Sequence, residues 1–156
     1  MINQLKINET VITGLEQELS CPVIFSNQTA PVPTYPYCSF TITNLANQSH
    51  GTYGLGLDEV YRKEIIQTWS FTIQSNDDDE AMLLTLKAYD FFNLKGKLVF
   101  SDGGVVVQNV TQISNRDNLV TIEYEHRYGF DVRLSICNEI NVSFGEIDEV
   151  EFNKIH

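Results

Sequence analysis

The sequence predicts an α+β domain in which two α-helices pack on one face of a mainly antiparallel β-sheet. Apolar and polar residues alternate over 37–44, 66–75 and 130–137, as they do in half-buried strands. Apolar residues recur at helical spacing over 7–20 and 81–93. No internal repeat or linker divides the 156 residues, so we expect a single domain over 1–156.

The first half of the chain begins with the helix over 7–20, in which Val11, Leu15 and Leu19 share one side. Cys21-Pro22 should end it, because a residue that precedes proline avoids the helical region. A short strand over 22–26, a proline-containing extended segment over 27–36 and the strand over 37–44 follow. Polar and glycine-rich residues then predict a long loop over 46–59.

The second helix should start at an acidic cluster that suits the positive end of the helix dipole. Asp77 is expected to be its N-cap, with Glu80 completing a capping box. Apolar residues stand on most sides of 81–93, including Met82 and Leu86, which predicts a helix buried over a broad face.

The second half of the chain after this helix predicts further strands over 97–101, 105–113, 119–126 and 130–137. Turn-forming residues separate them at 102–104 and 115–118. The acidic tail over 138–156 is expected to be a last edge strand or a mobile arm.

The composition excludes several classes of protein. Ten Lys and Arg against 21 Asp and Glu give a net charge of −11, and the basic residues are scattered, which disfavours tight nucleic-acid binding. No apolar run approaches the roughly 20 residues that cross a bilayer, so we expect no membrane partner. The three cysteines, Cys21, Cys38 and Cys137, are odd in number and far apart, which predicts buried free thiols.

Patterns that carry chemistry are missing or weak. The acidic run before the second helix lacks the register of a calcium loop, and Gly54-Leu-Gly56 lacks the rest of a phosphate-binding motif. His126 could form an acid/base pair with Glu123 or Asp131, but residues of one strand rarely converge, so a surface or interface histidine is favoured. Asp131 is expected to pair with a cross-strand cation. We therefore expect no enzyme, no cofactor and no metal site, and a binding or assembly role by default.

Several stretches carry a resemblance in their order and spacing over residues 7–137. A Pro-x-Pro-x-Tyr-Pro-Tyr segment enters a strand, and Trp69 begins a strand that runs into the acidic-capped helix. The other stretches are Tyr-Asp-Phe-Phe at 89–92, Ser-Asn-Arg-Asp at 114–117, and Glu-Tyr-Glu-His-Arg-Tyr-Gly-Phe-Asp-Val-Arg at 123–133. Together they resemble the neck and tail-terminator proteins of long-tailed bacteriophages.

The resemblance implies a small α+β subunit of a homohexameric ring. Such a ring caps the head-proximal end of the tail tube, stops its polymerisation and joins the tail to the head connector. It implies contacts with the tail tube protein and a head-connector or stopper protein, passage of DNA through the lumen without specific binding, and a place in the virion after assembly in the host cytoplasm.

Two sets of residues are candidates for roles in such a ring. Tyr53, Leu55 and Leu57 are apolar residues of the predicted loop without an evident core role, so we expect them to become buried on assembly. Asp58 and Glu59, like the acidic tail, are candidates for a lumen wall that repels phosphate; a solvated outer face would suit them equally.

Three other functions remain open from the sequence. Within the phage interpretation, a head-closure or adaptor protein would share the ring symmetry and the lack of catalysis. Outside it, a ligand-binding β-domain would have a concave aromatic pocket, built from Trp69, Tyr37 and Tyr124. An enzyme would instead show a perturbed carboxylate or histidine in a cleft.

Overall fold

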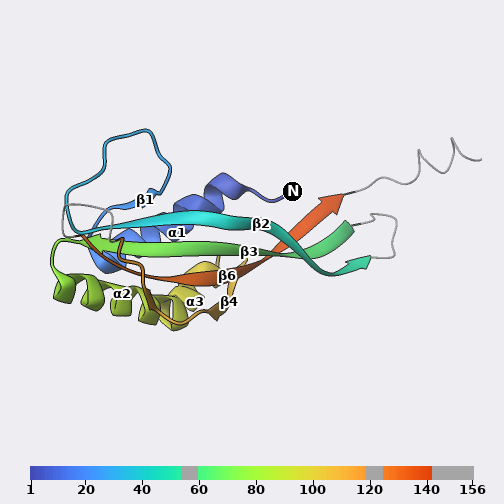
Figure 1. Ribbon diagram of the computed structural model, residues 1–156. Helices are drawn as coiled ribbons and strands as arrows, with labels where there is room; N and C mark the ends of the chain where they lie inside the picture. Colours follow the sequence, from blue (N-terminus) through green and yellow to red (C-terminus); the bar gives the residue numbers. More distant parts are fainter. Residues whose placement is uncertain (54–59, 119–124, 142–156) are drawn as a thin grey trace, which may run out of the picture.

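A computed structural model describes residues 1–53, 60–118 and 125–141, and it confirms an α+β fold (Figure 1). The sheet has the strand order β1-β2-β3-β6-β4, with β5 also paired to β6. Every pair is antiparallel except β1 with β2. The strands are β1 Val23–Phe25, β2 Tyr37–Tyr53, β3 Val60–Ser75, β4 Val105–Val110, β5 Ser114–Asn115 and β6 His126–Asn141.

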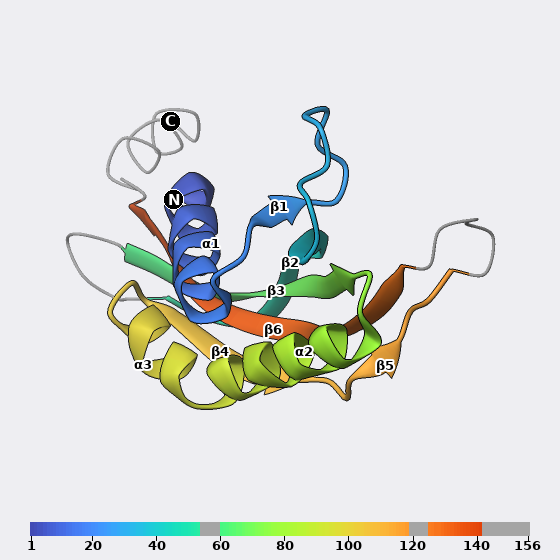
Figure 2. The same cartoon turned by 90° about the vertical axis from the view of Figure 1, so that its left-hand side faces the viewer.

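Three helices, rather than the predicted two, cover one face of this sheet: α1 Gln4–Leu19, α2 Asp78–Asn93 and α3 Lys95–Ser101. Figure 2 shows them together in front of the strands, and α1 contacts both α2 and α3. The strand predicted over 97–101 is therefore wrong. Gly96 and Phe100, four residues apart, are both buried while Leu98 between them is 74% exposed, which is helical spacing rather than alternation.

The core lies between the helices and the sheet and is rich in aromatic rings. Trp69 stacks on Phe40 with ring centroids 5.2 Å apart, and Phe71 lies 4.9 Å from Phe92. Helix α1 contributes a stripe of buried side chains at the predicted spacing: Ile7, Val11, Leu15 and Leu19. Burial of each such side chain contributes roughly 1.5–3 kcal/mol, so this shared core holds the helices against the sheet.

The ends of two helices follow the local sequence. Helix α1 ends at Ser20, which is left-handed (φ 55°) and donates its N–H to the Glu16 carbonyl, just before Cys21-Pro22. Asp77 caps α2 as predicted by accepting from the Asp79 N–H at 3.1 Å. The predicted capping box is wrong, however, because Glu80 accepts from the buried Ser75 hydroxyl at 2.7 Å, and that hydroxyl accepts from the Asp77 N–H.

The central strands are longer than predicted. Strand β2 continues to Tyr53 and β3 starts at Val60, so much of the loop predicted over 46–59 is a paired hairpin. Register shifts near Asn44 and between Gln48 and Gly51 accommodate the polar residues that hid this strand. Strand β6 likewise extends through 138–141, the first residues of the acidic tail predicted over 138–156.

The strand predicted over 105–113 ends at Val110, and β5 includes Asn115 of a predicted turn. Most of the strand predicted over 119–126 lies outside the described residues; Glu125 has no regular structure, and His126 begins β6.

Candidate functional site: assembly surfaces

The distal ends of β2, β3 and β6 extend beyond the N-terminus of α1 as a projecting ribbon (Figure 1). We call residues 44–53, 60–66 and 138–141 the arm. Antiparallel pairing joins its strands throughout, from Asn47 opposite Ile66 to Tyr53 opposite Tyr61, and from Lys63 opposite Asn138 to Val60 opposite Asn141. The arm extends past the helices, and the Met1 ammonium ahead of α1 donates to the Glu139 carbonyl of the arm at 2.7 Å.

Of the predicted assembly residues, Tyr53 lies in the described ranges through its backbone. Tyr53 ends β2 in register with Tyr61. The side chain of Tyr53 and the residues Leu55, Leu57, Asp58 and Glu59 lie outside the described part of the structure. The burial of these side chains on assembly stays a prediction.

The two faces of the arm differ in chemistry. Gln67 of β3 points towards the helices, where its side chain donates to Gln4 of α1 at 2.6 Å. Because β3 and β6 pair without a register shift, Ile65, Lys63 and Tyr61 lie on the same side. The opposite face is polar: Arg62 pairs with Glu139 at 3.0 Å, and the Ser135 hydroxyl donates to Glu64.

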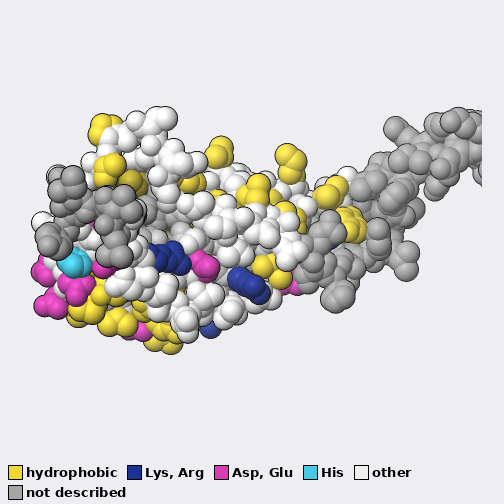
Figure 3. Space-filling view, in the orientation of Figure 1, with side chains coloured by type: hydrophobic (Ala, Val, Ile, Leu, Met, Phe, Trp, Pro, Cys, Tyr) yellow, Lys and Arg dark blue, Asp and Glu magenta, His cyan; other side chains and the backbone are white. Residues whose placement is uncertain are grey.

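A second exposed apolar surface lies on α2 and α3. Figure 3 shows hydrophobic side chains along the lower edge of the molecule, where these helices lie. Four residues make up what we call the leucine face, and they are between 52% and 74% exposed: Leu83, Leu86, Leu94 and Leu98. The prediction that Met82 and Leu86 bury against the core is wrong. The core takes only one side of α2, and these apolar residues on its other sides are exposed.

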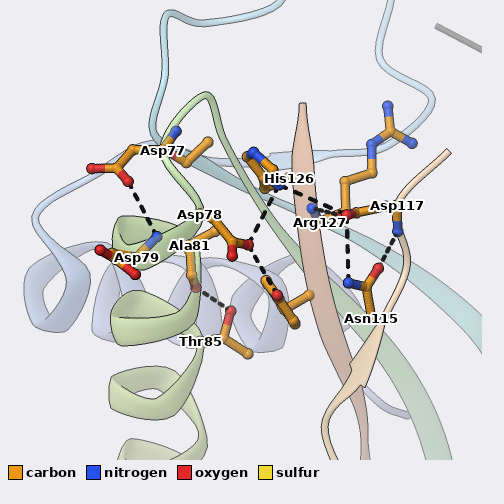
Figure 4. A network of polar contacts seen from close by, with 11 residues as sticks. Asp77, Asp78, Asp79, Ala81, Thr85, Asn115, Asp117, His126 and Arg127 are labelled. Atoms are coloured by element: carbon orange, nitrogen blue, oxygen red, sulfur yellow. Dashed lines mark hydrogen bonds and ion pairs between the residues drawn. The ribbon is translucent and has the colours of Figure 1, made fainter. Parts of the chain in front are cut away.

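A polar cluster joins the start of α2 to the start of β6 (Figure 4). His126 Nδ1 lies 3.4 Å from Asp78 Oδ1 and 3.7 Å from Asp117 Oδ2. The Tyr128 hydroxyl donates to Asp78 at 2.9 Å, and this hydrogen bond raises the pKa of the phenol. Of the two partners considered for His126, Asp131 pairs instead with Arg116, and Glu123 lies outside the described residues. The cluster fixes the helix to the sheet, and no group of possible metal ligands occurs in the described ranges.

Arg116 lies across the face of the sheet that the helices leave open. Its guanidinium donates to Ser70 Oγ, the Phe71 carbonyl and Thr72 Oγ1 at 2.8–3.2 Å, and to Asp131 at 3.2 Å. The predicted pairing of Asp131 with a cation is thus confirmed. Sequence spacing could not identify Arg116 as the cation that pairs with Asp131, because Arg116 follows β5 and does not lie on a predicted strand.

A groove of about 450 Å³ lies beside Arg116, between the sheet and the proline-containing segment after β1. Its lining includes Tyr37, Gln74 and Arg127. Burial and the nearby Glu125 carboxylate raise the pKa of Tyr37 to about 12. Trp69 is fully buried in the core, so the proposed aromatic pocket cannot include it, and Tyr124 lies outside the described residues. The groove is polar, which does not fit the aromatic site that a ligand-binding β-domain would need.

The cysteines are free thiols. Cys21 and Cys38 are buried as predicted, and burial raises the pKa of both, that of Cys21 to about 11. Cys137 is exposed, so its predicted burial is wrong. It lies opposite Glu64 on the side of β6 that alternation turns away from the helices.

Comparison with known proteins agrees with an assembly role. No helix among the described residues is long and apolar enough to span a membrane. No curated protein matches the sequence. The family described as phage neck terminator protein matches residues 9–156, nearly the whole chain and all of the elements after the first turn of α1. The chain therefore belongs to the phage neck terminator proteins, which are structural proteins of the phage neck.

Proposed function

We propose that this protein is the subunit of a ring that caps the head-proximal end of a phage tail tube, stops tube polymerisation and joins the tail to the head connector. The observation that carries the proposal is the match of the neck terminator family to residues 9–156. The arm and the leucine face add physical support, since a closed ring needs two different contact surfaces on each subunit. The ring is a homohexamer, in line with the resemblance seen in the sequence.

The partners of the ring follow from its position. One side contacts the last ring of the tail tube protein, and the other contacts a head-connector or stopper protein. DNA passes through the lumen without specific binding. The net charge of −11 supports this passage, because acidic side chains repel phosphate over a screening distance of about 8–10 Å. Asp58 and Glu59 are the proposed contribution to this wall.

A proposed ring contact uses Tyr53, Leu55 and Leu57. Replacing all three by serine should lower ring formation and lengthen tails, because apolar side chains that become buried between subunits would be lost. Val32→Ser is the matched control, since Val32 is 67% exposed on the proline-containing segment and should change neither property. Unchanged oligomeric state and unchanged tail length in the triple variant would overturn this contact.

Tail length in a phage that lacks the chain tests the proposed function itself. A terminator predicts tails of variable, excessive length that fail to join heads. A head-closure or adaptor protein predicts tails of normal length that remain separate from heads. Normal tails attached to heads would contradict both functions.

A further inference from the structure

The apolar side of the sheet continues past the helices onto the arm. The Met1 ammonium donates to the Glu139 carbonyl of the arm, and helix α1 itself covers this side as far as Gln67, through the paired side chains of Gln4 and Gln67. Beyond that point, β3 turns Ile65, Lys63 and Tyr61 to the same side by strand alternation. Ile140 of β6, in register with Tyr61, is 41% exposed. This side of the arm is therefore a half-buried apolar strip with Lys63 and, opposite it on β6, Asn138 near its middle.

The leucine face is an apolar strip that carries Asp90 near its middle and Lys87 beside it. Leu83, Leu86 and Asp90 follow one another at intervals of three and four residues, which places them on one side of α2, and Leu94 follows the helix as its C-cap. Leu98 continues the strip on α3. The four leucines leave roughly 500 Å² exposed, towards the upper end of the largest apolar patches found on monomeric proteins.

These two strips lie in different parts of the molecule. Figure 1 shows the arm at one end of the sheet and α2 near the other, so the arm of a subunit points away from its own α2. A second copy of the chain can bring the two together, and repeating that unlike contact around an axis closes a ring. The exposed area of the leucine face is consistent with a second copy of the chain as its partner. A stable interface buries about 800 Å² on each partner, and the four leucines supply over half of that area.

Charge supports the same pairing. Lys63 stands between Tyr61 and Ile65 on its strip, and Asp90 stands between Leu86 and Leu94 on the other. Within the described ranges neither side chain forms a salt bridge, although four other Lys and Arg side chains there do. Opposite charges at matching places fix the register of an apolar contact and disfavour wrong partners.

We propose that the helix-facing side of the arm of one subunit packs on the leucine face of the next, with Lys63 opposite Asp90. This contact rests on the proposed ring and names its two surfaces. It places the tip of the arm next to the neighbouring subunit, beside the contact proposed for Tyr53, Leu55 and Leu57.

Charge exchange tests the contact. Lys63→Asp and Asp90→Lys should each raise the concentration at which half of the chains are assembled by about tenfold or more, and combining them should restore assembly to within about threefold of the wild type. Arg62→Asp is the matched control, because Arg62 is the neighbour of Lys63 on the opposite face. Combined with Asp90→Lys, it should not restore assembly. Each variant is measured by size-exclusion light scattering.

The outcomes separate the contact from the function. If the wild-type chain forms rings and either the single variants assemble normally or the double variant fails to recover, the proposed contact is wrong while the ring stands. If the wild-type chain is a monomer on its own, the same variants are compared for capping of purified tail tubes. The single variants should then cap tubes poorly, and the double variant should cap them nearly as well as the wild type. A wild-type chain that neither forms rings nor caps tubes would refute the function as well. Thermal unfolding of each variant separates lost contact from lost fold.

Discussion

Replacing Gly129 by alanine should displace Arg116 and destabilise the fold. A Cβ atom at residue 129 would clash with the Phe71 carbonyl of the neighbouring strand and would lie 2.7 Å from Arg116 Nη1. Glycine within a strand often marks a place where another group approaches the backbone closely. Here that group is a guanidinium, 28% exposed, with four hydrogen-bond acceptors.

The magnitude follows from two losses. Forcing a methyl group against a backbone carbonyl costs about 1–3 kcal/mol, and shifting the partly exposed Arg116 weakens charged hydrogen bonds by about 1 kcal/mol more. We therefore expect Gly129→Ala to lower the free energy of unfolding by about 2–4 kcal/mol, and Arg116→Ala by about 1–2 kcal/mol. The double variant should lose about 1 kcal/mol less than the sum, because removing the guanidinium relieves one of the two clashes.

Urea unfolding followed by the fluorescence of Trp69, the single tryptophan, measures these values. Gly103→Ala is the matched control, because its nearest neighbour is the Phe100 carbonyl at 3.6 Å and the change should stay within about 0.5 kcal/mol. The reasoning is refuted if Gly129→Ala is as mild as this control, or if the Gly129 and Arg116 changes add without coupling.

Three further predictions concern the core and the thiols. Phe92→Ala should cost about 3–5 kcal/mol in unfolding free energy, because the ring is fully buried among four other phenylalanines; a loss under about 1 kcal/mol would contradict that packing. A thiol-alkylating reagent should add one group per native chain, at exposed Cys137, and three in urea, as counted by mass spectrometry; rapid native labelling of Cys21 or Cys38 would contradict their burial. Folding raises the pKa of Cys21 from an ordinary 9.0 to about 11. The unfolded thiol therefore ionises between pH 9 and 11 while the folded thiol does not. The stability that the buried Cys21 thiol contributes is complete below pH 9 and is lost as the pH rises towards 11. Cys21→Ala should flatten this part of the stability profile, and an unchanged slope would count against the raised pKa.

The sequence predicted the elements whose periodicity matches their burial. Alternation around Phe40, Trp69 and Phe130 identified the three central strands because one face of each lies in the core. Asp77 identified the start of α2 because capping is a local interaction.

Other features depended on contacts distant in sequence. The β2 part of the arm contains polar residues and register shifts. Its strand structure comes from pairing with β3 rather than from a local sequence pattern. His126 meets Asp78, which is 48 residues away and whose proximity no spacing rule gives. Leu86 was assigned to the core because hydrophobicity alone does not distinguish a side chain buried in the fold from one that is exposed on a contact surface.

Electron microscopy of growing tail tubes tests the central claim most directly. Purified chain is added to tube protein during polymerisation, and tube ends and lengths are recorded over time. The account predicts one ring of six subunits at a single end of each tube, an open centre, and growth that stops when the ring binds. Tubes that continue to elongate with bare ends in the presence of excess chain would contradict it.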